Sequence, residues 1–223
     1  QYGKLEALRE GTKPEQLIAE MDAARVQVAG LCGTDTARVA EACARYPGRF
    51  FGMVSPDPRD IMTCLRQIEA AVREYGCKAV KIEPFMWGKP PTDRIYYPIY
   101  AKCVELDIAF TTQIGHTGPD TFPSEVGRPI DLDQVALDFP ALRIVGGHIG
   151  WPWTEEAIAV AWKHRNVWID TSAHVPKHFP PAFTHFLRTL GRDKCLFASD
   201  WPLLPIGRPL GELAQYCPMP EEV

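Results

Sequence analysis

Histidine and aspartate side chains stand at the ends of three separate apolar runs. His116 ends the run IAFTTQIGH, His148 lies in GGHIGWPW, and Asp200 lies in FASDWP. Imidazole and carboxylate groups together select a zinc- or manganese-type divalent ion. Such an ion with an open coordination position lowers the pKa of a bound water toward neutrality, and a nearby histidine that does not bind the ion can move protons.

Further polar and aromatic residues lie near the same points of the sequence. Lys81 and Glu83 end the run KAVKIEP, and His174 ends VWIDTSAH, so all three are candidates for contacts with a substrate. Trp151 and Trp201 follow two of the runs, where aromatic walls suit a cyclic or conjugated substrate. Packing in the hydrophobic core explains the two tryptophans equally well.

A structural role is the alternative for each of these polar residues. A lone histidine at a strand end is more often a hydrogen-bonded structural residue, and Asp170 in VWIDTSAH can simply cap the next turn. The convergence of two histidines and an aspartate at three strand ends favours a functional site over this alternative. His164, His178 and His185 fall on expected helices or their edges, and we assign them no catalytic role.

The elements that would position these residues alternate along the whole chain. Short buried strands are expected at 26–32, 50–56, 78–84, 108–116, 143–150, 167–174 and 194–202. Helices are expected at 13–24, 34–46, 59–75, 95–106, 131–138, 154–164 and 181–190, with a last one that begins near Gly211. Continuous apolar runs indicate strands covered on both faces, as in parallel sheets. The alternation predicts a doubly wound open sheet or a (β/α)₈ barrel.

The barrel is the better of these two interpretations. A doubly wound sheet would carry a glycine-rich phosphate loop after an early strand, and neither G-x-G-x-x-G nor G-x-x-x-x-G-K-[ST] occurs. Seven strands are one fewer than the barrel contains, and residue 1 is glutamine, so we expect the first strand upstream of Gln1. Residues 1–223 are then one incomplete barrel domain, in which polar residues at the carboxyl ends of strands face the active site.

Composition excludes several classes of protein. The chain has 223 residues, 24 Lys+Arg against 28 Asp+Glu, and 46% hydrophobic residues, which is typical of a soluble globular protein. We expect no nucleic-acid partner, because there is no concentrated basic face, and no membrane span, because no apolar run approaches ~18 residues. The seven cysteines are scattered without C-x-x-C spacing, which favours reduced thiols in a cytoplasmic protein.

The segments GGHIGWPW, VWIDTSAH and LFASDWPLL, with KIEPF and QIGHTGP before them, resemble the amidohydrolase-related metal-dependent TIM-barrel hydrolases. This branch includes aminocarboxymuconate semialdehyde decarboxylase and the resorcylate-type decarboxylases, and the likeness covers nearly the whole chain. Its members hold a metal with a His-x-His pair after the first strand, a histidine after the fifth and an aspartate after the eighth. The resemblance implies that His116 and Asp200 are metal ligands. It implies that His148 is the sixth-strand histidine, which binds a second metal in some members and acts as acid/base in the single-metal branch.

The chain departs from the family pattern at both ends. It contains no His-x-His pair, and its C-terminal PMPEEV is shorter than the family's final helix. We therefore expect that two metal ligands lie upstream of Gln1 and that the C-terminal end of the barrel is also missing. If the 223 residues were the whole protein, two of the usual metal ligands would be absent.

The resemblance implies an enzyme with one divalent metal, zinc in the first place and manganese as the alternative. The favoured function is hydrolysis of a C–O or C–N bond in a small cyclic or carboxylated substrate by metal-activated water. Asp200 would bind the ion and take the water's proton, and His148 would stabilise or protonate the intermediate. The alternatives are non-oxidative decarboxylation of an aromatic or muconate-type acid at the same site, and a degenerate barrel that only binds a small molecule. A homodimer through exposed apolar helix faces is also compatible with the sequence.

Overall fold

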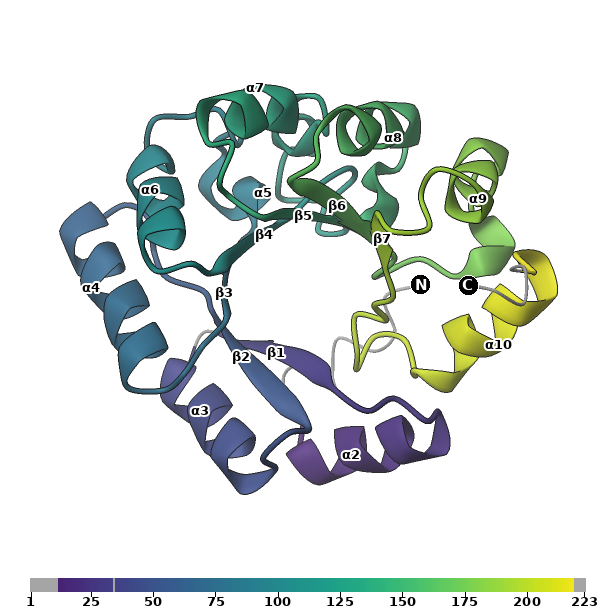
Figure 1. Ribbon diagram of the computed structural model, residues 1–223, viewed down its shortest axis with the longest axis horizontal. Helices are drawn as coiled ribbons and strands as arrows, with labels where there is room; N and C mark the ends of the chain where they lie inside the picture. The colour runs from purple at the N-terminus through teal and green to yellow at the C-terminus, as the bar shows by residue number, and fades with distance from the viewer. Residues whose placement is uncertain (1–11, 34, 219–223) are drawn as a thin grey trace.

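Seven parallel strands form the sheet of this protein. The computed structural model describes residues 12–33 and 35–218, and within them the spatial order of the strands follows the sequence. The strands are β1 (Ala29–Gly33), β2 (Phe50–Val54), β3 (Ala79–Ile82), β4 (Ala109–Gln113), β5 (Ile144–Gly147), β6 (Val167–Asp170) and β7 (Cys195–Leu196). Figure 1 shows the sheet curled part of the way around a central axis, with the helices outside it. This is an incomplete (β/α)₈ barrel, and the predicted fold class is confirmed.

Helices connect consecutive strands, as parallel pairing requires. The longer ones are α2 (Pro14–Ala23), α3 (Thr36–Arg45), α4 (Ile61–Arg73), α6 (Tyr97–Glu105), α7 (Asp131–Asp138), α8 (Thr154–Lys163), α9 (Pro181–Arg188) and α10 (Gly207–Tyr216). Short helical turns occupy some of the connections: α5 (Pro84–Trp87), η1 (Glu125–Gly127), η2 (His148–Gly150) and η3 (Pro176–His178). Three expectations lie outside the described residues: a first strand upstream of Gln1, a helix that starts at Thr34, and a shortened C-terminal end at residues 219–223.

Several elements differ from the sequence-based expectations. The strands expected at 108–116, 143–150 and 167–174 end earlier, at Gln113, Gly147 and Asp170. The last helix begins at Gly207 rather than near Gly211, because Pro209 lies in its first turn, where a missing N–H breaks no helical hydrogen bond. Strand β7 contains two residues, whereas a strand over 194–202 was expected. Among the described residues it pairs with β6 alone. The loop after β3 contains the single turn α5, with Pro84 at its first position.

Apolar side chains fill the space between the sheet and its helices. Tyr100 of α6 packs edge-on against Phe110 of β4 with 4.8 Å between ring centroids, and both side chains are almost fully buried. Ile144 of β5 and Val160 of α8 belong to the same cluster. Burial of side chains of this size stabilises the fold by about 1.5–3 kcal/mol each, so the strand ends project from a rigid frame.

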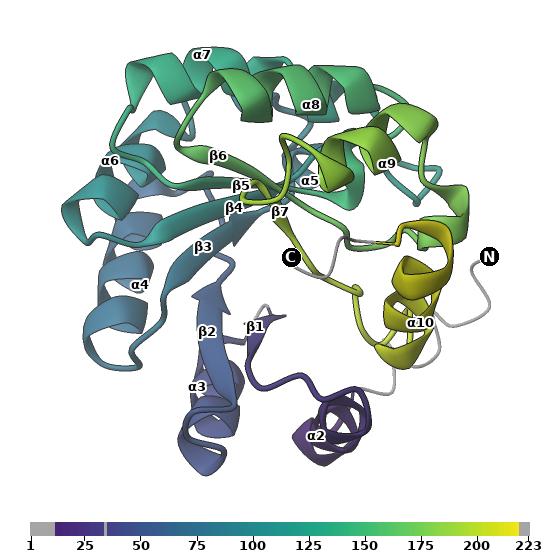
Figure 2. The ribbon, with the colours of Figure 1, turned by 45° about the vertical axis from the view of Figure 1, so that its right-hand side comes forward.

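A second, smaller cluster joins the two ends of the described chain. Its buried members come from α2, α3, β2 and the start of α10: Leu17, Met21, Ala42, Phe50 and Ile206. Figure 2 shows α2 and α10 side by side. Glu20 of α2 accepts hydrogen bonds from the indole Nε1 of Trp201 at 3.0 Å and from the backbone N–H of Ile206 at 2.9 Å. These contacts fix the segment that directly follows Asp200.

His164 has a structural role, in agreement with the sequence analysis. Its Nε2 lies 2.7 Å from Oδ1 of Asp133, and Nζ of Lys163 lies 2.6 Å from the same oxygen, so the end of α8 is tied to α7. None of the helices in the described part of the chain is long and apolar enough to cross a membrane.

Candidate functional site

The carboxyl ends of four strands carry the predicted site residues. His116 follows β4, His148 follows β5, His174 follows β6 and Asp200 follows β7. Because the strands are parallel, these ends lie at one face of the barrel. We call these four residues the strand-end group.

His148 and Asp200 face each other across this group. Nε2 of His148 lies 4.0 Å from Oδ2 of Asp200, and the side chains are 16% and 27% exposed. Both residues have left-handed backbone conformations, with φ of 73° and 62°. Non-glycine residues in this region cost free energy and gather at functional sites. The distance exceeds a hydrogen bond, so the two groups are not bonded to each other and both can contact a ligand atom that lies beside them.

Asp170 holds the backbone of His148 in place. Its Oδ1 accepts hydrogen bonds from the backbone N–H of His148 at 3.4 Å, from the backbone N–H of Ser172 at 2.9 Å and from the Ser172 hydroxyl. Gly147 makes this approach possible, since a Cβ there would lie 3.1 Å from Oδ2 of Asp170. The carboxylate therefore caps the turn after β6, as the alternative interpretation of the sequence had it, and also restrains His148.

Burial keeps the two inner histidines neutral near pH 7. It lowers the pKa of His148, although the charges of Asp200 and Asp170 oppose that shift. Burial, together with the charge of His148, also lowers the pKa of His174 to about 4. A neutral imidazole can accept a proton or act as a ligand, so both rings are available for either role.

A cation lies opposite these acidic and imidazole groups. Nζ of Lys81 lies 3.7 Å from Oε1 of Glu83. Burial lowers the pKa of Lys81, whereas the nearby carboxylates of Glu83 and Asp200 raise it, so the ammonium persists. Cys32 of β1, which the sequence analysis did not single out, has a pKa raised mainly by burial among the strands and stays a neutral thiol.

Both the backbone and the ring of His116 are held. The backbone N–H of His116 donates to the carbonyl of Trp151 at 2.6 Å. The side-chain amide of Gln113 donates to the backbone carbonyl of His116 at 3.1 Å. Its ring stands edge-on to Trp151 with 5.5 Å between centroids, and Nδ1 lies 3.1 Å from Oγ of Ser124. Ser124 lies too far along the chain for the sequence pattern to connect it with His116.

The two predicted aromatic walls have different surroundings. Trp151 contacts His116 and is 45% exposed, so it can line the site. Trp201 is held by Glu20 and packs with the α2–α10 cluster. The structure thus brings Lys81, Glu83, His116, His148, His174, Trp151 and Asp200 to one face of the barrel and turns the Trp201 indole N–H toward α2.

Gly115 has the conformation that allows His116 and Trp151 to meet. Its φ is +85°, and a Cβ there would lie 2.5 Å from the carbonyl oxygen of Trp151. We expect Gly115→Ala to reduce the free energy of unfolding by about 3 kcal/mol, because the clash adds to the cost of the left-handed backbone. Gly48→Ala is the matched control: its φ is +77° with nothing within 4 Å, so it should lose about 1 kcal/mol. Urea denaturation measures both, and equal losses would contradict the close approach.

The candidate site supplies some, but not all, of the ligands that a metal ion needs. His116 and Asp200 supply imidazole and carboxylate groups, which suit manganese and zinc. Among residues 12–33 and 35–218, no three His, Cys, Asp or Glu side chains are placed to hold an ion by themselves. These two residues therefore fit such an ion in donor chemistry, and they need further ligands.

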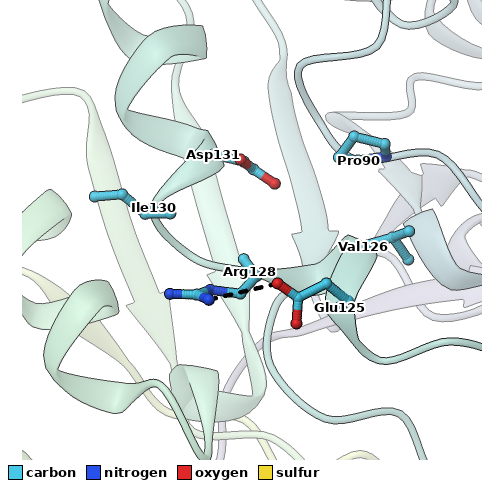
Figure 3. A pocket seen from close by; sticks show the side chains of 6 residues that line it. All are labelled: Pro90, Glu125, Val126, Arg128, Ile130 and Asp131. Atoms are coloured by element: carbon cyan, nitrogen blue, oxygen red, sulfur yellow. Dashed lines mark hydrogen bonds and ion pairs between the residues drawn. The ribbon is translucent and has the colours of Figure 1, made fainter.

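A surface pocket of about 450 Å³ lies apart from this group. Figure 3 shows its lining: Pro90, Glu125, Val126, Arg128, Ile130 and Asp131. Arg128 is engaged by Glu125 at 3.4 Å and by Glu156. None of the predicted site residues lines this pocket.

Two curated enzymes resemble this chain in sequence. A gamma-resorcylate decarboxylase of Rhodococcus jostii is 26% identical over 216 residues, with 74% of this chain and 64% of that protein covered. A 2-keto-4-carboxy-3-hexenedioate hydratase of Sphingobium is 26% identical over 144 residues, with 55% and 41% covered. The chain spans less than two thirds of the length of these two curated relatives.

Solved structures share the fold. An uncharacterized TIM-barrel protein of Bordetella bronchiseptica superposes with a TM-score of 0.84 at 25% identity, covering 97% of this chain and 79% of that one. A dihydroxybenzoic acid decarboxylase of Polaromonas, solved with manganese and 2-nitroresorcinol, gives a TM-score of 0.73 at 16% identity, covering 100% and 86%. Residues 10–222 match the family described as Amidohydrolase. The chain therefore belongs to the amidohydrolase family of enzymes.

Proposed function

We propose that this protein is a metal-dependent, non-oxidative decarboxylase of an aromatic or similarly conjugated carboxylic acid. The observation that carries the proposal is the placement of the Lys81 ammonium near the facing pair His148 and Asp200 at the carboxyl ends of the strands. A decarboxylase needs a cation to attract the carboxylate and a group that moves a proton, and these residues offer both.

The comparisons favour decarboxylation over the hydrolysis expected first. Of the relatives named above, those with a stated activity are two decarboxylases and a hydratase, and every named substrate carries a carboxylate. Hydrolysis of a C–O or C–N bond has no such support among them. The hydratase keeps water addition to a conjugated acid as the second candidate.

We further propose manganese as the ion, rather than zinc. The support is the manganese in the Polaromonas decarboxylase structure and the donor chemistry of His116 and Asp200. When bound, the ion supplies a Lewis acid that orients and polarises an oxygen of the substrate. His116 and Asp200 would hold it together with further ligands.

The proposed proton transfer follows from the burial of His148. Decarboxylation adds a proton to the carbon that bears the carboxylate. The bond between that carbon and the carboxylate carbon then breaks. Its electron pair returns to the conjugated system, and CO₂ leaves. His148 is neutral near pH 7 because burial lowers its pKa, so it can take up a proton and deliver it at Nε2. Lys81 attracts the carboxylate, and Trp151 offers an exposed ring beside the site.

Metal removal and restoration tests the proposed function. The protein is expressed from its own gene, stripped with a chelator, and mixed with 2,6-dihydroxybenzoate. We expect CO₂ release only after Mn²⁺ is restored. Lactone and amide substrates in parallel detect hydrolysis. If the protein takes up Mn²⁺ but releases no CO₂ from a panel of aromatic acids, the proposal is wrong, and substrate binding without turnover would indicate a degenerate barrel.

A further inference from the structure

The segment after β4 turns back on itself and brings Ser124 against His116. Gly115 donates its backbone N–H to the carbonyl of Gly127 at 2.6 Å, and a Cβ on Gly127 would lie 2.7 Å from the carbonyl oxygen of Gly115. Only a residue without a side chain permits this approach at position 127. The rings of Phe85 and Phe122, 5.4 Å apart, fasten the same segment to α5. The position of Ser124 is therefore fixed by contacts that do not involve its own hydroxyl.

The Ser124 hydroxyl makes two contacts in the loop that it closes. Oγ accepts a hydrogen bond from the backbone N–H of Thr117 at 3.2 Å and lies 3.1 Å from Nδ1 of His116. A hydroxyl oxygen has a second lone pair, so it can accept from Nδ1–H while its own proton points to solvent. Nδ1 of His116 is thus occupied by a protein partner, and Nε2 is the ring nitrogen left for a ligand.

We propose that Ser124 is a positioning residue that holds His116 in the tautomer protonated at Nδ1, so that the lone pair of Nε2 is presented to the metal. A ring nitrogen binds a metal only through its lone pair, and the partner of the other nitrogen decides which tautomer is present. The purpose of this arrangement rests on the proposed metal-dependent function, but the tautomer itself is a property of the metal-free protein.

Trp151 supports the same assignment from a second side. Its ring meets the ring of His116 at an interplanar angle of 90°, and its carbonyl accepts the backbone N–H of His116. The imidazole is therefore restrained in position by Trp151 and in orientation by Ser124. The Ser124 hydroxyl is the hydrogen-bond partner of Nδ1 among the described residues, and the proposal assigns it the acceptor role in that contact.

Nitrogen NMR of histidine-labelled protein tests this inference. The protein, expressed from its own gene and freed of metal, is recorded at a pH where His116 is neutral, and His116→Asn assigns the resonance. We expect a protonated Nδ1 and an unprotonated Nε2 in the parent protein and in Ser124→Thr, which keeps the hydroxyl. Ser124→Ala should shift His116 toward the Nε2–H form that free imidazole prefers. Thr121→Ala removes an exposed hydroxyl from the same loop and should change nothing.

Manganese affinity gives the second readout. We expect the dissociation constant for Mn²⁺ to rise about 10- to 100-fold in Ser124→Ala and to stay near the parent value in Ser124→Thr. A parent protein protonated at Nε2, or a tautomer unchanged in Ser124→Ala, would overturn the inference. Should Ser124→Ala fail to fold, the parent and Ser124→Thr spectra still decide the tautomer. The expected tautomer in a protein that releases no CO₂ would support this inference and contradict the proposed decarboxylation.

Discussion

Replacement of Asp200 by asparagine is expected to abolish Mn²⁺ binding and to lower the rate of CO₂ release by about 10³-fold. The carboxylate is the negative donor among the two proposed ligands, and its loss removes both charge and a metal bond. Asparagine keeps the size of the side chain and tolerates the left-handed backbone, with φ of 62°, that Asp200 adopts. The fold should therefore survive, and the loss can be assigned to the site. Metal content and turnover are measured on the same sample.

Asp193→Asn is the matched control for this experiment. Asp193 lies just before β7, at the opposite end of the strand from Asp200, and its side chain is exposed. The same change of charge at this position should leave metal content and turnover at the parent level. Retention of manganese in Asp200→Asn, with unfolding excluded by circular dichroism, would contradict the assignment of Asp200 as a ligand.

Replacement of His148 by asparagine should lower turnover by about 10²- to 10⁴-fold while metal content stays unchanged. His148 faces Asp200 from 4.0 Å, and we assign it proton transfer rather than metal binding. Asparagine also tolerates the φ of 73° at this position, so the hydrogen bond from its backbone N–H to Asp170 can persist. The measurement compares kcat and manganese content between the two proteins.

His178→Asn provides the comparison for a histidine outside the site. His178 is exposed in η3 and should tolerate the change with full activity. If His148→Asn lost manganese together with activity, His148 would be a ligand, as in relatives with two metals. Full activity in that variant would remove His148 from the chemistry.

Much of the fold could be predicted from the sequence because the strands are continuous apolar runs between helices with one apolar face. The bounds of α7, at Asp131–Asp138, agree with the expected 131–138. Strand β7 could not be predicted in length, since pairing depends on a neighbouring strand and not on its own residues. Helix α10 begins at Gly207, before the expected start near Gly211, because its first turn accommodates Pro209.

The candidate site was predictable to the extent that its residues are adjacent to strands. His116, His148 and Asp200 follow β4, β5 and β7, and any parallel barrel brings such positions to one face. The contact of Glu20 with Trp201 spans nearly the whole chain, and no local pattern indicates it. The hydrogen bond from the backbone N–H of Ser172 to Asp170 is an exception. An aspartate side chain commonly accepts a hydrogen bond from the backbone N–H two residues later, so this contact can be predicted from the sequence.

The most direct test of the account follows carboxyl-labelled 2,6-dihydroxybenzoate by NMR in D₂O, with the protein expressed from its own gene and loaded with Mn²⁺. We predict that the labelled carboxyl carbon leaves as CO₂ and that one deuterium appears at the vacated ring carbon, with neither change in Asp200→Asn. A manganese-loaded protein that retains the carboxyl label on this and related conjugated acids, while it hydrolyses or hydrates them, would contradict the account.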